Sequence, residues 1–193
     1  MCSVEGTRST GVPDILIDLI AALHENTGAQ VRSGNNLSNR FQTTSGVRQG
    51  SILAPALFSV AIDWILNHMS TTPGIKVGAR QFTDLVYADD TTFFVPSALD
   101  AAECLSSFNS SSSVLGMRVS WAKTKLQNIG SGVHGHPSNI MVDGNTVEQV
   151  DNFIYLGSTQ SSNGGSQADI MRRIALASSV MSSLQQVWKD RYL

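Results

Sequence analysis

The chain has 193 residues, of which 41% are hydrophobic and 15% charged, a composition typical of globular rather than disordered proteins. No apolar run reaches the roughly 18 residues that a membrane span needs, and the first residues lack the basic-then-apolar order of a secretory signal. Cys2 and Cys104 are too far apart for a Cys-x-x-Cys zinc knuckle or a disulfide framework. We therefore expect an intracellular protein, nuclear or cytoplasmic, that is neither secreted nor bound to a membrane.

The net charge is −2 and the isoelectric point is about 6.0. This overall charge disfavours nucleic-acid binding, because proteins bind phosphates mainly through Lys and Arg. The charge is unevenly distributed, however. Arg118, Lys123 and Lys125 lie between residues 115 and 130, where no acidic residue occurs. A solvated face explains such a group of cations as readily as a phosphate-binding patch does.

The first half of the chain predicts two helices and a hairpin. A helix is expected over residues 13–24, because Pro13 suits a first helical turn, and Gly28 is a natural stop. Short strands at 30–32 and 40–44 surround a turn-rich tip at 33–36. A polar loop at 45–51 leads to a second helix after Pro55, which has apolar residues at three- and four-residue spacing and ends at 71–74.

The second half predicts further hairpins. Strands at 82–87 and 91–95 flank Ala88-Asp89-Asp90, and a helix at 98–110 runs into four serines, which are poor in helix interiors. Strands at 117–121 and 126–129, a loop at 131–138, a hairpin at 140–147 with an Asp143-Gly144 turn, a strand at 153–156 and a helix at 166–189 follow. No regular βαβ repeat occurs, so the fold class is α+β with a mostly antiparallel sheet.

The acidic pair Asp89-Asp90 lies between two apolar strands. Carboxylate oxygens at a hairpin tip suit Mg²⁺, which prefers hard oxygen ligands, and clustered carboxylates are what two-metal phosphoryl transfer needs. Asp is also an ordinary turn residue, so for the pair alone a simple turn is the more usual explanation. His134 and His136 lack acidic or cysteine partners at metal-finger spacing and are read as a loop.

Four segments together resemble the reverse transcriptases of non-LTR (LINE-type) retrotransposons. Tyr87-Ala88-Asp89-Asp90 is similar to the Tyr-x-Asp-Asp motif of that family, and residues 46–58 resemble its Gly-x-x-Gln-Gly-x-x-x-Ser-Pro-x-Leu-Phe segment, with Ala54 where Ser is common. Residues 116–124 resemble the Gly-Leu-x-Ile-Asn-x-x-Lys-Thr segment, with Ser120 in place of Asn. Residues 153–157 resemble the aromatic-Leu-Gly hairpin called the primer grip. The four occur in the family's order.

The resemblance implies a role for each matching residue. Asp89 would bind catalytic Mg²⁺ (or Mn²⁺) and Asp90 would assist it, with Tyr87 near the primer end. Gln49 and Gly50 would lie against the incoming deoxynucleoside triphosphate and the RNA template. Lys123 would donate a proton to the leaving pyrophosphate, although Lys125 is an alternative. Leu156 and Gly157 would contact the DNA primer.

The resemblance also implies a partial site. In the family a further carboxylate, on an Ala-Phe-Asp type segment, lies upstream of the helix that matches residues 13–24, whereas residues 1–12 contain Glu5 as their only acid. We therefore expect a reverse-transcriptase palm over residues 1–160 that lacks the fingers and the first palm strand, and the start of a helical thumb over 161–193. Such a chain would be inactive alone, and the metal would be needed only in a complete enzyme.

Two other interpretations remain open. The chain could be a non-catalytic relic that folds partly and binds nucleic acid through residues 118–125. It could also be an unrelated α+β domain in which Asp89-Asp90 is only a turn, which the four ordered motifs disfavour. The sequence does not indicate an oligomeric state.

Overall fold

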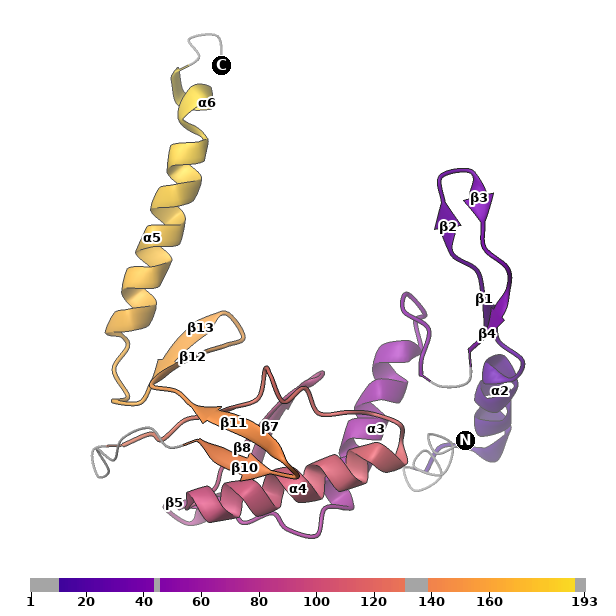
Figure 1. Cartoon of the computed structure of the whole chain (residues 1–193), viewed down its shortest axis with the longest axis horizontal. Coiled ribbons are helices and arrows are strands. Elements are labelled where there is room, and N and C mark those ends of the chain that lie inside the picture. The colour runs from indigo at the N-terminus through magenta and orange to yellow at the C-terminus, as the bar shows by residue number, and fades with distance from the viewer. Residues whose placement is uncertain (1–10, 44–45, 131–138, 190–193) are drawn as a thin grey trace. The chain divides into compact units, whose positions relative to one another are not determined.

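The structure, a computed structural model, describes residues 11–43, 46–130 and 139–189. Over these residues it is a mixed α+β fold, as predicted, with five helices and small, mostly antiparallel sheets (Figure 1). It divides into two compact units, one up to Val119 and one from Ser120 onward, and each is described by itself. Within the described ranges, no helix is both long and apolar enough to cross a membrane.

Two of the first unit's helices begin where the sequence predicts. Helix α2 (Asp14–His24) begins directly after Pro13, and α3 (Ala54–Asn67) carries Pro in its first turn. The predicted end of this helix at residue 24 is confirmed: α2 ends at His24, and its C-cap Glu25 has an extended backbone. Gly28, four residues beyond the helix end, begins a strand.

Helix α4 (Ala98–Val114) is longer than predicted, because it continues through the four serines at 110–113. Ser97 begins it as an N-cap, its Oγ accepting a hydrogen bond from the Asp100 backbone N–H at 3.2 Å. Inside the helix, the Ser112 hydroxyl donates to the Phe108 carbonyl at 2.7 Å and is buried. The Ser111 hydroxyl reaches the His68 carbonyl at 3.2 Å. The Ser111 and Ser112 hydroxyls therefore donate to carbonyls. They do not end the helix by competing for its backbone hydrogen bonds, which was the reason for expecting it to end at the serines.

The predicted hairpin near residue 34 is present but interrupted. Strand β1 (Gly28–Ala29) pairs with β4 (Phe41–Gln42), and β2 (Arg32–Ser33) pairs with β3 (Asn36–Leu37). Between the two ladders the Ser38 hydroxyl accepts from the Val31 backbone N–H at 2.9 Å. The Ser38 side chain thus replaces a backbone hydrogen bond between the two arms of the hairpin. Each arm is therefore divided into two strands that are shorter than predicted.

Two further hairpins follow α3. Strand β5 (Ile75–Val77) pairs with β6 (Arg80–Phe82), and β7 (Asp84–Tyr87) pairs with β8 (Asp90–Phe93). The first of these was not predicted. It takes Phe82 out of the predicted 82–87 strand, because a turn at Gly78, with φ of 62°, lets residues 80–82 pair backward with 75–77.

The second unit contains the remaining strands. Strand β11 (Asn145–Gln149) pairs antiparallel with β10 (Ile140–Val142) through the predicted Asp143-Gly144 turn, and pairs parallel with β9 (Lys125–Leu126). Strand β12 (Asn152–Tyr155) forms a hairpin with β13 (Ser158–Ser161). The predicted 126–129 strand is kept only at Leu126. Residues 117–121 form no strand, because the Ser120 carbonyl accepts from two N–H groups in a turn at 120–124.

The predicted helix over 166–189 is confirmed with one interruption, as α5 (Gln167–Ser183) and α6 (Gln185–Lys189) separated at Leu184. The predicted loop at 131–138 lies outside the described residues. The expected single sheet is not seen among the described residues, whose strands form small separate sheets.

The apolar core of the first unit is formed mainly by α3 and α4. The hydrophobic residues buried in these two helices are Ala54, Leu57, Ile62, Ile65, Ala101 and Cys104. Ile65 is fully buried, whereas Ile52, in the loop just before α3, is 96% exposed. The chain therefore offers two isoleucines with opposite environments.

We predict that Ile65→Ala lowers the free energy of unfolding by roughly 2–5 kcal/mol, because it removes buried methyl groups and leaves a cavity. The matched change Ile52→Ala should alter it by less than about 0.5 kcal/mol. Urea unfolding followed by circular dichroism measures both. Equal effects from the two changes would mean that the α3–α4 interface does not stabilise this unit.

Candidate active site

The acidic pair lies at the end of the β7–β8 hairpin. Asp89 is the second residue of a two-residue turn, and Asp90 begins β8 directly opposite Tyr87. Both carboxylates are exposed, and Tyr87 is 63% exposed. The structure therefore brings together the three residues that the Tyr-x-Asp-Asp resemblance singles out and leaves them open to solvent.

The other end of this hairpin is fixed to helix α4. Phe93 packs edge-on against Phe108, with ring centroids 5.2 Å apart. Asp84 accepts a hydrogen bond from the Thr83 hydroxyl at 2.6 Å and lies near the buried Cys104. Burial raises the pKa of that thiol to about 11, and the Asp84 charge contributes to the increase. Since side chains alternate along a strand, Tyr87 and Asp90 lie on the face opposite Phe93.

The donor atoms of the acidic pair suit a hard divalent cation. Mg²⁺ is commonly bound by one or two carboxylates, with substrate phosphates and water completing its octahedral shell. In the described part of the chain, however, no cluster of three or more His, Cys, Asp or Glu side chains could hold a metal ion. Asp89 and Asp90 thus fit a site that takes its remaining oxygen ligands from elsewhere.

The Gln49-Gly50 pair lies in the exposed loop before α3. The Ser51 backbone N–H donates to the Arg48 carbonyl at 3.1 Å and closes a turn around the pair. Gly50 has φ of 87°, and a Cβ atom there would meet no atom within 4 Å. The left-handed backbone, rather than crowding within the chain, therefore requires glycine at this position. A close approach to a nucleotide stays a prediction.

The two candidate lysines have different environments. The Lys125 Nζ forms an ion pair with Glu148 Oε2 at 2.7 Å, across the parallel pairing of β9 with β11. Lys123 is exposed, in the turn whose backbone N–H donates to the Ser120 carbonyl at 2.9 Å. Within the described residues, no ion pair involves Lys123. Arg118 belongs to the first unit and the two lysines to the second.

Leu156 and Gly157 form the turn of the β12–β13 hairpin, between the paired residues Tyr155 and Ser158. Both have positive φ, 47° and 78°, as a type I′ turn requires. Leu156 is 53% exposed, and a Cβ atom on Gly157 would meet nothing within 4 Å. The outer side of this turn is therefore open.

Two residues that the motifs did not indicate hold this turn. Asp169 Oδ1 accepts from the Thr159 backbone N–H at 2.7 Å, and Arg172 donates to the Gly157 carbonyl and, at 3.0 Å, to the Thr159 hydroxyl. By sequence, the 169–173 segment is typical of an ordinary helical ion pair. Nothing local in it indicates a contact with residue 157.

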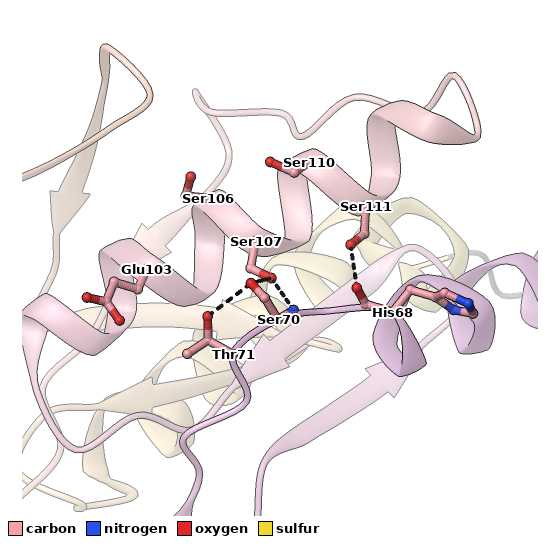
Figure 2. Close-up of a pocket in the computed structure, with 8 residues that line it drawn as sticks. All are labelled: His68, Ser70, Thr71, Glu103, Ser106, Ser107, Ser110 and Ser111. Carbon is pink, nitrogen blue, oxygen red and sulfur yellow. Dashed lines mark hydrogen bonds between the residues drawn. The ribbon is translucent and has the colours of Figure 1, made fainter.

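The pocket between the end of α3 and α4 contains none of the predicted site residues (Figure 2). Its lining is mostly hydroxyls, and Figure 2 shows Ser70 joined to Ser107 and Thr71. The Ser107 hydroxyl also accepts from the Ser70 backbone N–H at 2.8 Å. These bonds connect the segment after α3 to α4, so the pocket's polar groups serve the fold.

We predict that Leu156→Asn raises the free energy of unfolding by about 1 kcal/mol, because Asn tolerates left-handed backbone that costs other side chains roughly 1–2 kcal/mol. Urea unfolding measures the change. Asp143, which has a φ of 50° in the other type I′ turn, provides the control: Asp143→Leu should lower stability by a similar amount. If neither change alters stability, the turns are not strained.

Comparisons with known proteins identify relatives of the chain. A profile of the family described as "Reverse transcriptase (RNA-dependent DNA polymerase)" matches residues 6–160. The "Retrovirus-related Pol polyprotein from type-2 retrotransposable element R2DM" of Drosophila melanogaster is 26% identical over 153 residues, which cover 79% of this chain and 14% of that protein. The "Retrovirus-related Pol polyprotein from type-1 retrotransposable element R2" of Popillia japonica is 26% identical over 168 residues, 81% of this chain and 27% of that protein.

The chain thus spans only 14% and 27% of the lengths of these two relatives. The family profile covers most of the chain, including the Gln-Gly loop, the acidic hairpin and the Leu156 turn. The chain belongs to the reverse transcriptase family, and it is distantly related to the Pol polyproteins of R2 non-LTR retrotransposons.

Proposed function

We propose that this chain supplies the palm of an RNA-directed DNA polymerase that extends a DNA primer on an RNA template. The observation that carries the proposal is the β7–β8 hairpin, which is fixed to α4 at Phe93 and exposes Asp89 and Asp90 at its other end. Residues 1–160 would form the palm and residues 161–193 the start of a thumb. The substrates would be deoxynucleoside triphosphates.

Asp89 would be the principal ligand of Mg²⁺ or Mn²⁺, and Asp90, opposite Tyr87 on β8, would assist it. The ions supply charge neutralisation for the transferring phosphoryl group and its leaving pyrophosphate. Tyr87, exposed beside the pair, would contact the primer end. The open Gln49-Gly50 loop would bind the template and the incoming nucleotide, since glycine leaves its backbone accessible.

Of the two lysines, Lys123 is the better candidate for protonating pyrophosphate. A general acid needs a free, mobile proton donor within reach of the leaving group. The Lys125 ammonium is occupied by Glu148 at 2.7 Å, whereas Lys123 is exposed on a turn. The same ion pair also offsets one of the three positive charges at residues 118–125, which weakens the alternative of a non-catalytic nucleic-acid-binding relic.

Efficient catalysis would require a further carboxylate. Two adjacent Asp side chains do not surround a metal ion, and phosphoryl transfer depends mainly on positioning. In the family that ligand lies on an Ala-Phe-Asp type segment, and Glu5 is the only acid in residues 1–12. We therefore expect that supplying such a carboxylate, on an Ala-Phe-Asp strand joined upstream of residue 11, increases primer extension.

The test is Mg²⁺-dependent extension of a DNA primer on an RNA template, with the chain and with the chimera that carries the added strand. In the active form, Asp89→Asn should lower the rate by at least about 10²–10³-fold, the usual effect of removing a group that stabilises transition-state charge. Asp63→Asn, which changes an exposed carboxylate on α3, is the control and should leave the rate unchanged.

Extension by the unmodified chain, abolished by Asp89→Asn, would support the polymerase and refute the need for a further carboxylate. Extension unaffected by Asp89→Asn would refute the assigned site. Duplex binding without extension in either form would favour the non-catalytic alternative.

In the form that extends primers, Lys123→Ala should lower the rate of a single nucleotide addition by roughly 10²-fold or more, as expected for loss of a general acid. Lys125→Ala is the matched control and should change it little, because that lysine is paired with Glu148. Rapid-quench measurement of a single nucleotide addition distinguishes them. The opposite ranking would assign the role to Lys125.

A further inference from the structure

The first turns of α5 are bonded to the β12–β13 hairpin by side chains. Asp169 and Arg172 lie one helical turn apart. Together they make three hydrogen bonds to the hairpin: one to the Thr159 backbone N–H, one to its hydroxyl, and one to the Gly157 carbonyl. Gly157 is in the turn itself, and Thr159 is the second residue beyond it. Two points of the hairpin are therefore fixed to one face of the helix.

The charges in this network support one another. Asp169 Oδ2 accepts from Arg173 Nε at 2.6 Å, and Arg172 lies 3.6 Å from Asp169 Oδ1. The pKa of the Asp169 carboxyl is lowered to about 2. The largest cause is the hydrogen bond from the Thr159 N–H, and the next is the hydrogen bond from Arg173. The carboxylate is thus charged at neutral pH, and hydrogen bonds to charged groups are stronger than neutral ones.

Apolar packing contributes little to this attachment. Helix α5 contains no buried residue, and two apolar side chains in its first half, Ile170 and Ile174, are 47% and 58% exposed. The Asp169 side chain, by contrast, is only 15% exposed. Asp169 and Arg172 therefore provide most of what orients the turn relative to the helix.

We propose that Asp169 and Arg172 are positioning residues for primer binding, which hold the Leu156-Gly157 turn in one orientation on α5 while its outer side stays open to the primer strand. This inference rests on the proposed polymerase function. The arginine is suited to it because its planar guanidinium bonds two acceptors in a fixed relation, whereas a lysine offers a single point charge.

The chain contains a matched control for this proposal. Arg173 contacts the same Asp169 carboxylate as Arg172 does, but in the described structure it makes no hydrogen bond to the hairpin. Arg173→Ala therefore removes an equal charge without releasing the turn. Arg172→Lys keeps the charge and the helix but loses the two-point contact. It keeps the test valid if Arg172→Ala unfolds the protein.

The first measurement is fluorescence anisotropy of the full chain with RNA–DNA duplexes, one with a recessed primer 3′ end and one blunt duplex of equal length. Wild type should prefer the recessed end. Arg172→Ala, Arg172→Lys and Asp169→Asn should lose roughly tenfold of that preference, the size expected for a charged hydrogen bond, with unchanged affinity for the blunt duplex. Arg173→Ala should keep the preference.

The second measurement is the NMR order parameter of the Leu156 and Gly157 amides, which needs no ligand. It should be near 0.85 in wild type and below about 0.6 in the Arg172 and Asp169 variants. A turn that stays rigid in those variants would overturn the proposal. A loosened turn with an unchanged preference would also overturn it, because the contact would then be structural only.

The preference of the wild type for the recessed end separates failure of the primer role from failure of the positioning role. If wild type shows no preference for the recessed end, the proposed primer role of this hairpin is wrong, and the positioning role falls with it. If wild type prefers the recessed end and Arg172→Lys does so equally, only the positioning role is wrong.

Discussion

Left-handed backbone at two hairpin turns, one in each unit, is the constraint on which the candidate residues Asp89 and Leu156 depend. Ala88 precedes Asp89 with φ of 52°, and Leu156 precedes Gly157 with φ of 47°. Such conformations cost residues with ordinary side chains roughly 1–2 kcal/mol each and persist only where the surroundings fix them. The contacts that anchor each hairpin therefore help to fix the candidate residues at its own turn.

The two units anchor their hairpins by different physical means. In the first unit, Phe93 packs on Phe108 of a helix that belongs to the buried core. In the second, Asp169 and Arg172 bond to the hairpin from a helix that buries no side chain. Aromatic packing is insensitive to salt, whereas partly exposed ion pairs weaken as ionic strength rises. The Leu156-Gly157 turn should therefore respond to ionic strength, and the Ala88-Asp89 turn should not.

The sequence predicted features whose causes are local. Pro13 and Pro55 marked two helix starts, and the Asp143-Gly144 pair marked a turn, because backbone preferences act over a few residues. Prediction from the sequence failed where contacts between residues distant in sequence determine the local structure. The serines of α4 stay helical partly because Ser111 reaches the His68 carbonyl. The motifs located the candidate site residues but not Arg172, whose partner Gly157 is fifteen residues away in sequence.

Comparison of turns within the chain indicates that folding alone does not account for Leu156. The turn at Asp143-Gly144 has the same pair of positive φ angles and uses residue types that tolerate them. Leu156 occupies the equivalent first position with a side chain that does not, and it leaves that apolar side chain 53% exposed. The left-handed backbone costs stability, and no described contact offsets it at Leu156 itself. Local rules are broken in this way mainly at functional sites, and this turn is the one that Asp169 and Arg172 hold in place.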